Sequence, residues 1–389
     1  MARPVSAVAV TVLATLAIAH AAPPALFRAD ARHGGSYPGA GVPALHGVKW
    51  KFKSAGPVLS SPAVAGGTLY FGSSDHQVYA LDEKSGTLRW KFATHGRVTA
   101  SPAVAGGRVY VGSFDGNFYA LDAQSGALLW KFATEGERRF AARHLHGAEP
   151  AAETMPDPFD FFLSSPVTGG KLVYFGSGDG NVYALEAASG TLAWKFHTGN
   201  VVHASPALAD GTLYVGSWDS YFYALDAASG KERWSYSNKG SWVISSPAVR
   251  AGTLYFATSD TGLVRALDAK SGAEVFALEF KHWPFFSSPT LAGNTLYIGS
   301  HSGKLVAIDL GSRQLAWSFA TDGAQQHAAA YTKADGTPNY EAVFTDFFYD
   351  DMVSGVQRMM NVGAVLSTPV IDGDTVFFGS WDGQVYALN

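Results

Sequence analysis

The chain of 389 residues contains no cysteine. This absence excludes disulfides, covalent c-type haem attachment and a lipidated N-terminal cysteine. Charged residues make up only 15% of the chain and the formal net charge is -4, so the composition gives no reason to expect a nucleic-acid partner. The sequence also contains no Gly-rich phosphate loop, no nucleophile elbow and no His-Glu-x-x-His motif. The most familiar signatures of nucleotide, hydrolase and zinc-peptidase chemistry are therefore missing.

The first residues have the composition of a secretory signal peptide. Arg3 supplies positive charge, residues 5–18 are almost wholly apolar, and Ala19-His20-Ala21 offers small residues at a cleavage point. Because the apolar run is short for a bilayer span, we predict a signal peptide over 1–21 and no membrane span after its cleavage. Residues 22–45 carry Pro, Gly and Ala without periodicity and are expected to form a loose leader. The mature protein is then expected to be soluble, either in the periplasm or secreted.

Most of the chain consists of one repeat of roughly 40 residues. In its first copy, turn signals at 65–67, 74–76 and 84–86 separate short runs of strand-forming residues. This pattern predicts four antiparallel strands per copy and a β-propeller, whose blades cannot bury their faces singly and close into one unit. The prolines that mark the period are Pro62, Pro102, Pro166, Pro206, Pro247, Pro289 and Pro369.

The last copy of the repeat lacks its outer strand, and a matching strand is found at residues 48–52. We therefore predict an all-β, seven-bladed β-propeller over residues 46–389, in which the N-terminal strand completes the last blade and closes the ring. Insertions at 137–163 and 324–366 interrupt the period. The second is about as long as a blade, so eight blades are the alternative. We interpret residues 327–344 within it as a hairpin.

The repeat resembles the tryptophan-docking repeat of the PQQ-like propeller family, which includes quinoprotein alcohol dehydrogenases and the outer-membrane assembly factor BamB. The resemblance is carried by Ala80-Leu81-Asp82-Glu83-Lys84-Ser85-Gly86-Thr87-Leu88-Arg89-Trp90, and it recurs at 120–130, 184–194 and 224–234. It implies that each Trp packs between blades. Phe276 in place of Trp and Arg313 in place of Gly imply looser fifth and sixth blades.

The resemblance also bears on cofactors. The resemblance implies that the quinone-dependent enzymes of the family have a longer, eight-bladed chain. It also implies adjacent cysteines beside their cofactor, and calcium ligands. This chain has no cysteine and is expected to have seven blades. We therefore predict no cofactor, with PQQ and Ca2+ kept as alternatives.

Propeller connectivity brings both insertions and several aromatic residues to one face. The connections between the second and third strands emerge on the same face as those from an outer strand to the next inner strand, where both insertions occur. We predict an aromatic-lined mouth that binds a ligand; alternatively, the rings pack beneath the insertions. The candidate ligand-binding residues are Trp218, Trp381, Trp242, Trp283, Phe114 and Phe285, and the candidate catalytic residues are His203, His301 and Arg97.

One further group of residues has the chemistry of metal ligands. His144 and His146 lie in the first insertion, with Glu149 and Glu153 nearby. Solvated polar residues on a loop explain them as well, so we predict no metal site.

Three functions fit these observations. The first, which we favour, is an exported binding or scaffold protein that holds a peptide or protein segment through the aromatic face. The second is an exported enzyme, a lyase, isomerase or hydrolase acting on a small aromatic or carbohydrate substrate in the same mouth. A quinone-dependent dehydrogenase ranks last. A scaffold tolerates exposed insertions, whereas an enzyme folds them down to exclude water, and the catalytic question stays open at this point.

Overall fold

The computed structural model of the protein describes residues 25–33, 50, 52–56, 58–137, 140–141, 154–155, 163–259, 261–280, 284–334, 339–343, 355, 358–372, 375–382 and 385–388. These residues form six four-stranded antiparallel sheets and one three-stranded sheet, each from one copy of the repeat. A separate hairpin pairs β9 (Phe140–Ala141) with β10 (Thr154–Met155). The expectation of an all-β chain is confirmed.

Within each sheet the strands follow the chain from the innermost to the outermost. The first three sheets are β1 (Ala63–Ala65), β2 (Thr68–Ser73), β3 (Gln77–Asp82) and β4 (Leu88–Ala93); β5 (Ala103–Ala105), β6 (Arg108–Ser113), β7 (Asn117–Asp122) and β8 (Leu128–Ala133); and β11 (Val167–Gly169), β12 (Leu172–Gly176), β13 (Asn181–Glu186) and β14 (Leu192–His197). The next three are β15 (Ala207–Ala209), β16 (Thr212–Gly216), β17 (Tyr221–Asp226) and β18 (Glu232–Ser237); β19 (Ala248–Arg250), β20 (Thr253–Ala257), β21 (Leu263–Asp268) and β22 (Glu274–Glu279); and β23 (Thr290–Ala292), β24 (Thr295–Gly299), β25 (Lys304–Asp309) and β26 (Gln314–Ala320). The three-stranded sheet is β27 (Val370–Asp372), β28 (Thr375–Gly379) and β29 (Val385–Leu388).

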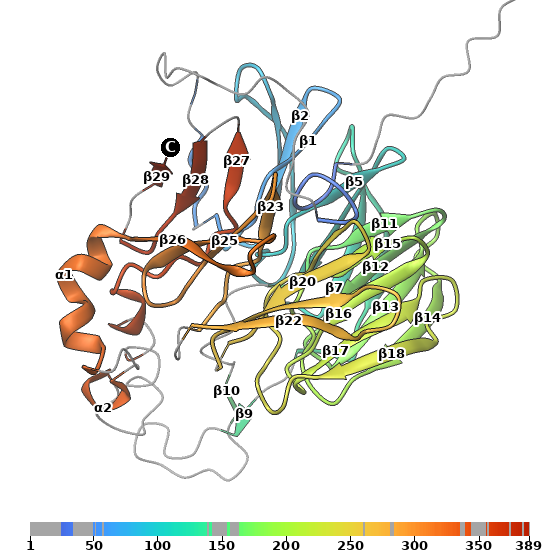
Figure 1. The fold of residues 1–389 in the computed structure, drawn as a ribbon. Coiled ribbons are helices and arrows are strands. Elements are labelled where there is room, and N and C mark those ends of the chain that lie inside the picture. Colours follow the sequence, from blue (N-terminus) through green and yellow to red (C-terminus); the bar gives the residue numbers. More distant parts are fainter. Residues whose placement is uncertain are drawn as a thin grey trace, which may run out of the picture.

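The sheets are arranged around a common axis, with their innermost strands toward the middle (Figure 1). Consecutive innermost strands are neighbours: β1 lies beside β5, β5 beside β11, β11 beside β15, β15 beside β19, and β23 beside β27. The hydrophobic core lies between the faces of adjacent sheets, where Phe118 of β7 stacks on Phe175 of β12 with 3.8 Å between ring centres. Because each sheet buries its faces only against its neighbours, the copies stabilise one another.

The turn between the third and fourth strands joins adjacent sheets. In the second sheet, Asp122 Oδ1 accepts hydrogen bonds from the backbone N–H of Ser125 (2.8 Å) and its hydroxyl (2.7 Å). Gly126 follows with a φ of 73°, which favours glycine. Trp90 of the first sheet lies over this glycine, and its Nε1 donates to the carbonyl of Ala123 at 3.0 Å. The Asp therefore shapes the turn and the Trp packs between sheets, as the sequence predicts.

Two residues of the expected closing strand lie within the described structure. Trp50 covers Gly86 of the first sheet and donates from Nε1 to the carbonyl of Glu83 at 3.0 Å. Phe52 lies 5.3 Å from Tyr79 between ring centres, in the geometry that Phe92 adopts toward Tyr119 of the next sheet (5.5 Å). These two side chains thus make outer-strand contacts against the first sheet. The backbone pairing of 48–52 lies outside the described residues.

The fifth and sixth sheets meet through a different pair of side chains. Arg313, at a φ of 57°, lies over the ring of Phe276 with 5.7 Å between the guanidinium carbon and the ring centre. The same side chain donates to the carbonyl of Val275 at 3.3 Å. The two departures from the repeat pattern are therefore a matched pair across one interface.

Restoring both consensus residues is expected to show this coupling. Phe276→Trp enlarges a ring that still faces Arg313, and Arg313→Gly uncovers Phe276, so each single change should destabilise the protein. The double variant recreates the Trp–Gly contact seen at Trp90. We expect it to be more stable than the sum of the single variants by about 1 kcal/mol in urea unfolding. Additive single effects would contradict the pairing.

Residues 25–33, within the segment expected to be a loose leader, bind across the inner strands. Ala25 pairs with Val104 of β5, with the N–H of each donating to the carbonyl of the other (2.9 and 2.8 Å). Farther along, the carbonyl of Ala31 accepts from Leu208 of β15 (2.6 Å), and that of Arg32 accepts from Val249 of β19 (3.0 Å). Figure 1 draws this segment in dark blue beside β5. For these nine residues the expectation of a loose segment does not hold, and we call them the N-terminal plug.

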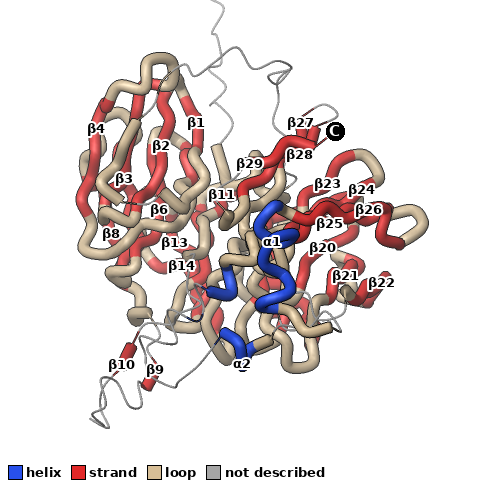
Figure 2. Tube along the Cα trace, turned by 90° about the vertical axis from the view of Figure 1, so that its left-hand side faces the viewer, coloured by secondary structure: helices blue, strands red, loops and turns tan. Residues whose placement is uncertain are grey.

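The described part of the second insertion is helical. Helix α1 (Asp322–Tyr331) begins after Thr321, whose side chain accepts from the N–H of Ala324 at 3.1 Å, and α2 (Tyr340–Val343) follows. The interpretation of 327–344 as a hairpin is therefore wrong, because a capped run of Ala and Gln forms a helix. In Figures 1 and 2, α2 lies at the same end of the molecule as β9 and β10. No helix among the described residues is long and apolar enough to cross a bilayer.

Candidate binding face and axial cavity

One repeated backbone contact positions the predicted mouth residues. The residue that follows the Gly-Ser end of the second strand donates its N–H to a carbonyl on the connection entering the same sheet. Four of the predicted residues share this position, so the repeat places their side chains at one level of the molecule. The bonds run from Phe114 to Arg97 (3.0 Å), from Trp218 to Val201 (2.9 Å), from His301 to Pro284 (2.7 Å) and from Trp381 to Ala364 (2.9 Å).

Five of the predicted residues form a continuous arc of side chains. The guanidinium carbon of Arg97 lies 4.7 Å from the centre of the Phe114 ring. His203 is edge-on to Phe114 at 6.4 Å and to Trp218 at 5.8 Å, and Trp218 stacks on Trp242 at 4.7 Å with the planes 11° apart. Trp218 is 3% exposed, whereas Arg97 lies at the surface. We call these five residues the aromatic arc.

His203 pairs with a carboxylate from the first insertion. Its Nε2 lies 3.2 Å from Oε2 of Glu137. A Cβ on Gly178 would lie 1.7 Å from the same carboxylate oxygen. Gly178 occupies the repeat position at which the second, fourth and seventh sheets carry Phe114, Trp218 and Trp381, so the missing side chain makes room for the His–Glu pair. The signal was visible in the sequence as Gly-Ser-Gly-Asp where neighbouring copies have Gly-Ser-Phe-Asp and Gly-Ser-Trp-Asp.

The other predicted residues lie elsewhere. His301 is 4% exposed and 5.4 Å from Phe286 between ring centres, and burial lowers its pKa to about 4. Phe285 is fully buried in the core, whereas Phe286 lines the axial cavity. Trp381 is 42% exposed, and Trp283 lies outside the described residues. The three candidate catalytic residues are thus not assembled, because His203 and His301 belong to separate clusters.

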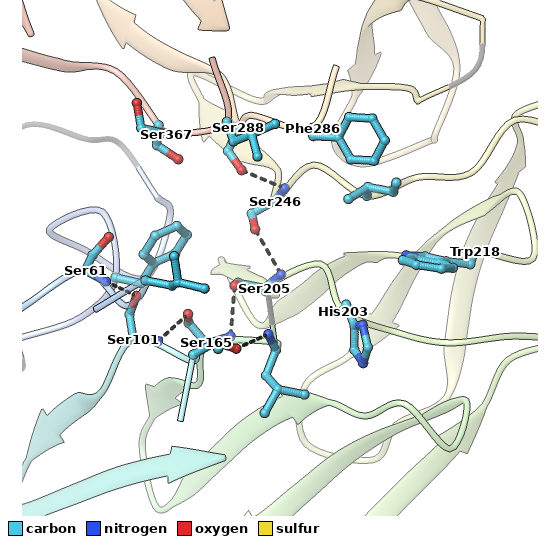
Figure 3. Close-up of a pocket in the computed structure, with 17 residues that line it drawn as sticks. Ser61, Ser101, Ser165, His203, Ser205, Trp218, Ser246, Phe286, Ser288 and Ser367 are labelled. Atoms are coloured by element: carbon cyan, nitrogen blue, oxygen red, sulfur yellow. Dashed lines mark hydrogen bonds between the residues drawn. The ribbon is translucent and has the colours of Figure 1, made fainter. Parts of the chain in front are cut away.

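A cavity of about 180 Å³ lies at the centre of the molecule (Figure 3). Its lining comes mostly from two positions of the repeat, the residue before each marker proline and the residue two places earlier. Phe27 of the N-terminal plug, Trp218 of the aromatic arc and Ser367 complete it. The residues before the prolines are Ser61, Ser101, Ser165, Ser205, Ser246, Ser288 and Thr368, and the earlier residues are Leu59, Thr99, Leu163, His203, Ile244, Phe286 and Leu366.

The serines are linked by hydrogen bonds from one sheet to the next. The backbone N–H of each serine donates to the hydroxyl of the following one, at 2.9–3.0 Å, from Ser61 through to Ser288. We call the five accepting residues, Ser101, Ser165, Ser205, Ser246 and Ser288, the serine ring. Sequence reasoning used the prolines as markers and missed this ring, although a hydroxyl precedes every one of them.

A second, polar cavity of about 480 Å³ is lined by Glu137 but not by His203. Glu135, Glu137, Asp179 and His197 contribute to its lining. Asp179 is held by the hydroxyl of Tyr183 at 2.7 Å, and Glu135 pairs with Lys195. Across the part of the chain that the structure describes, no three His, Asp or Glu side chains converge as a metal site. His144, His146, Glu149 and Glu153 lie outside that part.

The Trp–Gly contacts between sheets, and sheets that are each built from consecutive strands, are typical of a known repeat family. A family model described as "Outer membrane protein assembly factor BamB" matches residues 46–158 and 160–389. The chain belongs to this family. The sequence-based assignment to PQQ-like propellers related to BamB is therefore confirmed. No curated protein sequence matches the chain significantly.

Solved structures share this fold at low sequence identity. BamB from Moraxella catarrhalis superposes with a TM-score of 0.61 and 17% identity, over 87% of this chain and 85% of that one. A europium-containing methanol dehydrogenase gives 0.60 and 15%, over 87% and 78%. The quinohemoprotein alcohol dehydrogenase from Comamonas testosteroni gives 0.60 and 16%, over 85% and 65%. At such identities the likeness concerns the fold alone.

Proposed function

We propose that this family member is an exported binding or scaffold protein that holds an extended peptide or protein segment through its aromatic face. Arg97, Trp242 and Trp381 supply the contact surface, because Arg97 and Trp381 are exposed and Trp242 is half-buried at the same end of the sheets. Aromatic and arginine side chains carry much of the binding energy at protein interfaces. One of the solved relatives is BamB, named for its part in outer-membrane assembly, which accords with a protein partner.

The observation that carries the proposal is the separation of the candidate acid–base groups. A general acid and a general base that act on one substrate must both lie within reach of it. His203 is 6% exposed and bound to Glu137, and His301 is 4% exposed beside Phe286. Of these two histidines, His203 lines the axial cavity and His301 does not. The rings instead pack on one another, with Trp242 half-buried and the adjoining Arg97 exposed.

The axial cavity does not fit a pyrroloquinoline quinone. That group is a fused three-ring quinone with three carboxylates, and its charge calls for cationic partners or a metal. The cavity measures about 180 Å³ and is lined by Ser and Thr, aliphatic and aromatic residues and His203, with no Arg, Lys, Asp or Glu among them. Arg28, which donates to the carbonyl of the lining residue Ser246, offers one positive charge against three carboxylates. We therefore propose no quinone chemistry for this protein.

The His203–Glu137 pair favours a second candidate function. An imidazole 3.2 Å from a carboxylate, beside a polar cavity of about 480 Å³, is an arrangement that acid–base enzymes use. In this alternative the protein is an exported lyase, isomerase or hydrolase for a small aromatic or carbohydrate substrate. Glu137 would orient His203, and the substrate would occupy the polar cavity.

A peptide-binding measurement tests the favoured function. Purified protein is screened against an array of extended peptides, and the best binders are titrated by fluorescence anisotropy. We expect Trp381→Ala and Trp242→Ala each to weaken binding by about tenfold or more, as truncation of an interface aromatic does. Trp317→Ala is the matched control, because Trp317 is also exposed (38%) but lies on the outer strand β26.

Two results would overturn the proposal. In one, the array yields no saturable binder, or the control variant weakens binding as much as Trp381→Ala. In the other, the protein turns over a small aromatic or glycosidic substrate and His203→Gln or Glu137→Gln abolishes the turnover. The second result would establish the enzyme instead.

A further inference from the structure

The N-terminal plug closes one end of the axial channel. The chain enters each sheet from the mouth, passes the two lining positions and then forms the innermost strand. The plug pairs with those innermost strands, so it lies on the far side of the serine ring from the mouth. Phe27 reaches the cavity from this side, while Leu26 is packed in the core. The plug thus turns a channel into a blind pocket.

Six buried hydrogen-bond donors face the pocket. The five residues of the serine ring are 4–6% exposed, and the hydroxyl of each accepts one backbone N–H. A hydroxyl also carries a hydrogen to donate, and in the described structure these five donate to no protein atom. The sixth donor is the indole nitrogen of Trp218, which is buried without a partner. Figure 3 shows this nitrogen on the side of the indole that faces the serines.

A buried cation lies next to the same pocket. Arg28 is 3% exposed, and its Nη1 donates to the carbonyls of Ser246 (3.3 Å) and Pro247 (3.4 Å). Ser246 belongs to the serine ring, so the guanidinium of Arg28 contacts the backbone of a residue that lines the pocket. Its positive charge favours an anion over a cation in the pocket, because the field is weakly screened in a buried site. The remaining wall is apolar, from Leu163, Ile244 and Phe286 among others.

We infer that the axial pocket is a binding site for a compact carboxylate with an apolar body. The serine hydroxyls and the Trp218 indole donate to the carboxylate, Arg28 supplies the favourable charge, and Phe27 and the aliphatic residues contact the body. A buried donor without an acceptor is costly, so such a ligand satisfies the Trp218 indole and the serine hydroxyls, which donate to no atom of the described residues. The inference does not rest on the contact residues of the proposed function, since neither Trp381 nor Trp242 lines this pocket.

Calorimetric titration with benzoate and with 4-methylpentanoate tests the inference. We expect saturable binding of both carboxylates, none of benzylamine, and weaker binding of benzamide, which keeps an acceptor but has no charge. Trp218→Phe keeps the ring and removes the N–H, and Ser165→Ala removes one hydroxyl. Each should weaken binding by about tenfold, the effect of one charge-assisted hydrogen bond. Ser125→Ala, in the outer turn between β7 and β8, is the control and should bind as the wild type does.

Two further measurements test the role of Phe27 and identify the source of the carboxylate. Phe27→Ala opens the floor and should weaken benzoate binding while the fold survives, as checked by near-UV circular dichroism. A hexapeptide ending in leucine is compared with its C-terminal amide, because a carboxylate also ends every peptide chain. Binding of the acid form alone would make a peptide C-terminus the source of the ligand, and binding of the free carboxylates alone would make it a small molecule. No saturable heat from any carboxylate, or equal binding of benzylamine, overturns the inference.

Discussion

Gly126→Ala is expected to destabilise the protein by about 3 kcal/mol, because the new methyl group meets a docked indole and a strained backbone together. An ideal Cβ at Gly126 would lie 2.6 Å from Cδ2 of Trp90, well inside van der Waals contact. The backbone at Gly126 has a φ of 73°, which an L-residue adopts at a cost of roughly 1 kcal/mol or more. Relieving the clash requires Trp90 to leave the second sheet and break its 3.0 Å bond to the carbonyl of Ala123. Urea unfolding measures the loss.

Gly107→Ala in the same sheet is the matched control. Gly107 has a φ of 74°, and a Cβ there would meet no atom within 4 Å. The backbone strain is thus the same and the collision is absent, so we expect a loss of only about 1 kcal/mol. The difference between the two variants measures the docking of one tryptophan between two sheets. Equal losses would mean that the repeated Trp–Gly contact contributes nothing beyond turn geometry.

The repeat could be predicted from the sequence because its chemistry is local. The turn Asp122-x-x-Ser125-Gly126 closes within five residues, and strand length and alternation follow from composition alone. The docking Trp is not local, but it recurs at a constant offset from the turn, so its partner can be found by period. Trp50 is an example, because counting the outer strands predicts that it lies over Gly86.

The N-terminal plug could not be predicted, because nothing in residues 25–33 repeats. Its contacts are backbone hydrogen bonds to Val104, Leu208 and Val249, which any extended segment with free carbonyls can make. The pairing of His203 with Glu137 has the same character, since 66 residues separate them and an insertion intervenes. Interactions of this kind join segments that are far apart in the sequence, and no periodic signal marks them.

For the predicted mouth residues, the repeat likewise predicts their position but not their exposure to solvent. The shared position of Phe114, Trp218, His301 and Trp381 is a property of the repeat, and the backbone hydrogen bonds reproduce it. Whether a given ring reaches solvent depends on its neighbours in other sheets. Trp218 is covered by His203 and Trp242, whereas Trp381 remains 42% exposed. A pattern within one repeat carries no information about such coverage.

Acidification below pH 6.5 is expected to destabilise the protein steadily, because two histidines are buried in the neutral form. His33 of the N-terminal plug is fully buried, its Nδ1 donates to the carbonyl of Pro247 at 3.2 Å, and Nε2 has no partner. Burial and the neighbouring Arg28 lower its pKa to about 3. Burial beside Phe286 lowers the pKa of His301 to about 4.

The direction of the change in stability with pH follows from proton uptake. The unfolded chain binds a proton at each histidine near pH 6.5, whereas the folded chain does so only near pH 3 or 4. Stability is therefore full above pH 6.5 and falls as the pH decreases toward the folded pKa values, by up to about 1.4 kcal/mol per pH unit for each histidine. Carboxylates such as Asp226, whose pKa Arg233 lowers to about 2, lose their contribution only below pH 3.8. The window between pH 6.5 and 4.5 thus reports on the histidines.

Urea midpoints at pH 7.5, 6.0 and 5.0 measure this slope. His33→Gln and His301→Gln should each flatten it, whatever they do to stability at pH 7.5, because a glutamine takes up no proton. His95→Gln, at an exposed position on the connection after β4, is the matched control and should leave the slope unchanged. A wild-type midpoint that is constant from pH 7.5 to 5.0 would contradict the neutral burial of both imidazoles. If His33→Gln alone flattens the slope, the acid sensitivity belongs to the N-terminal plug, and lowering the pH should also weaken the floor of the axial pocket, to which the plug contributes Phe27.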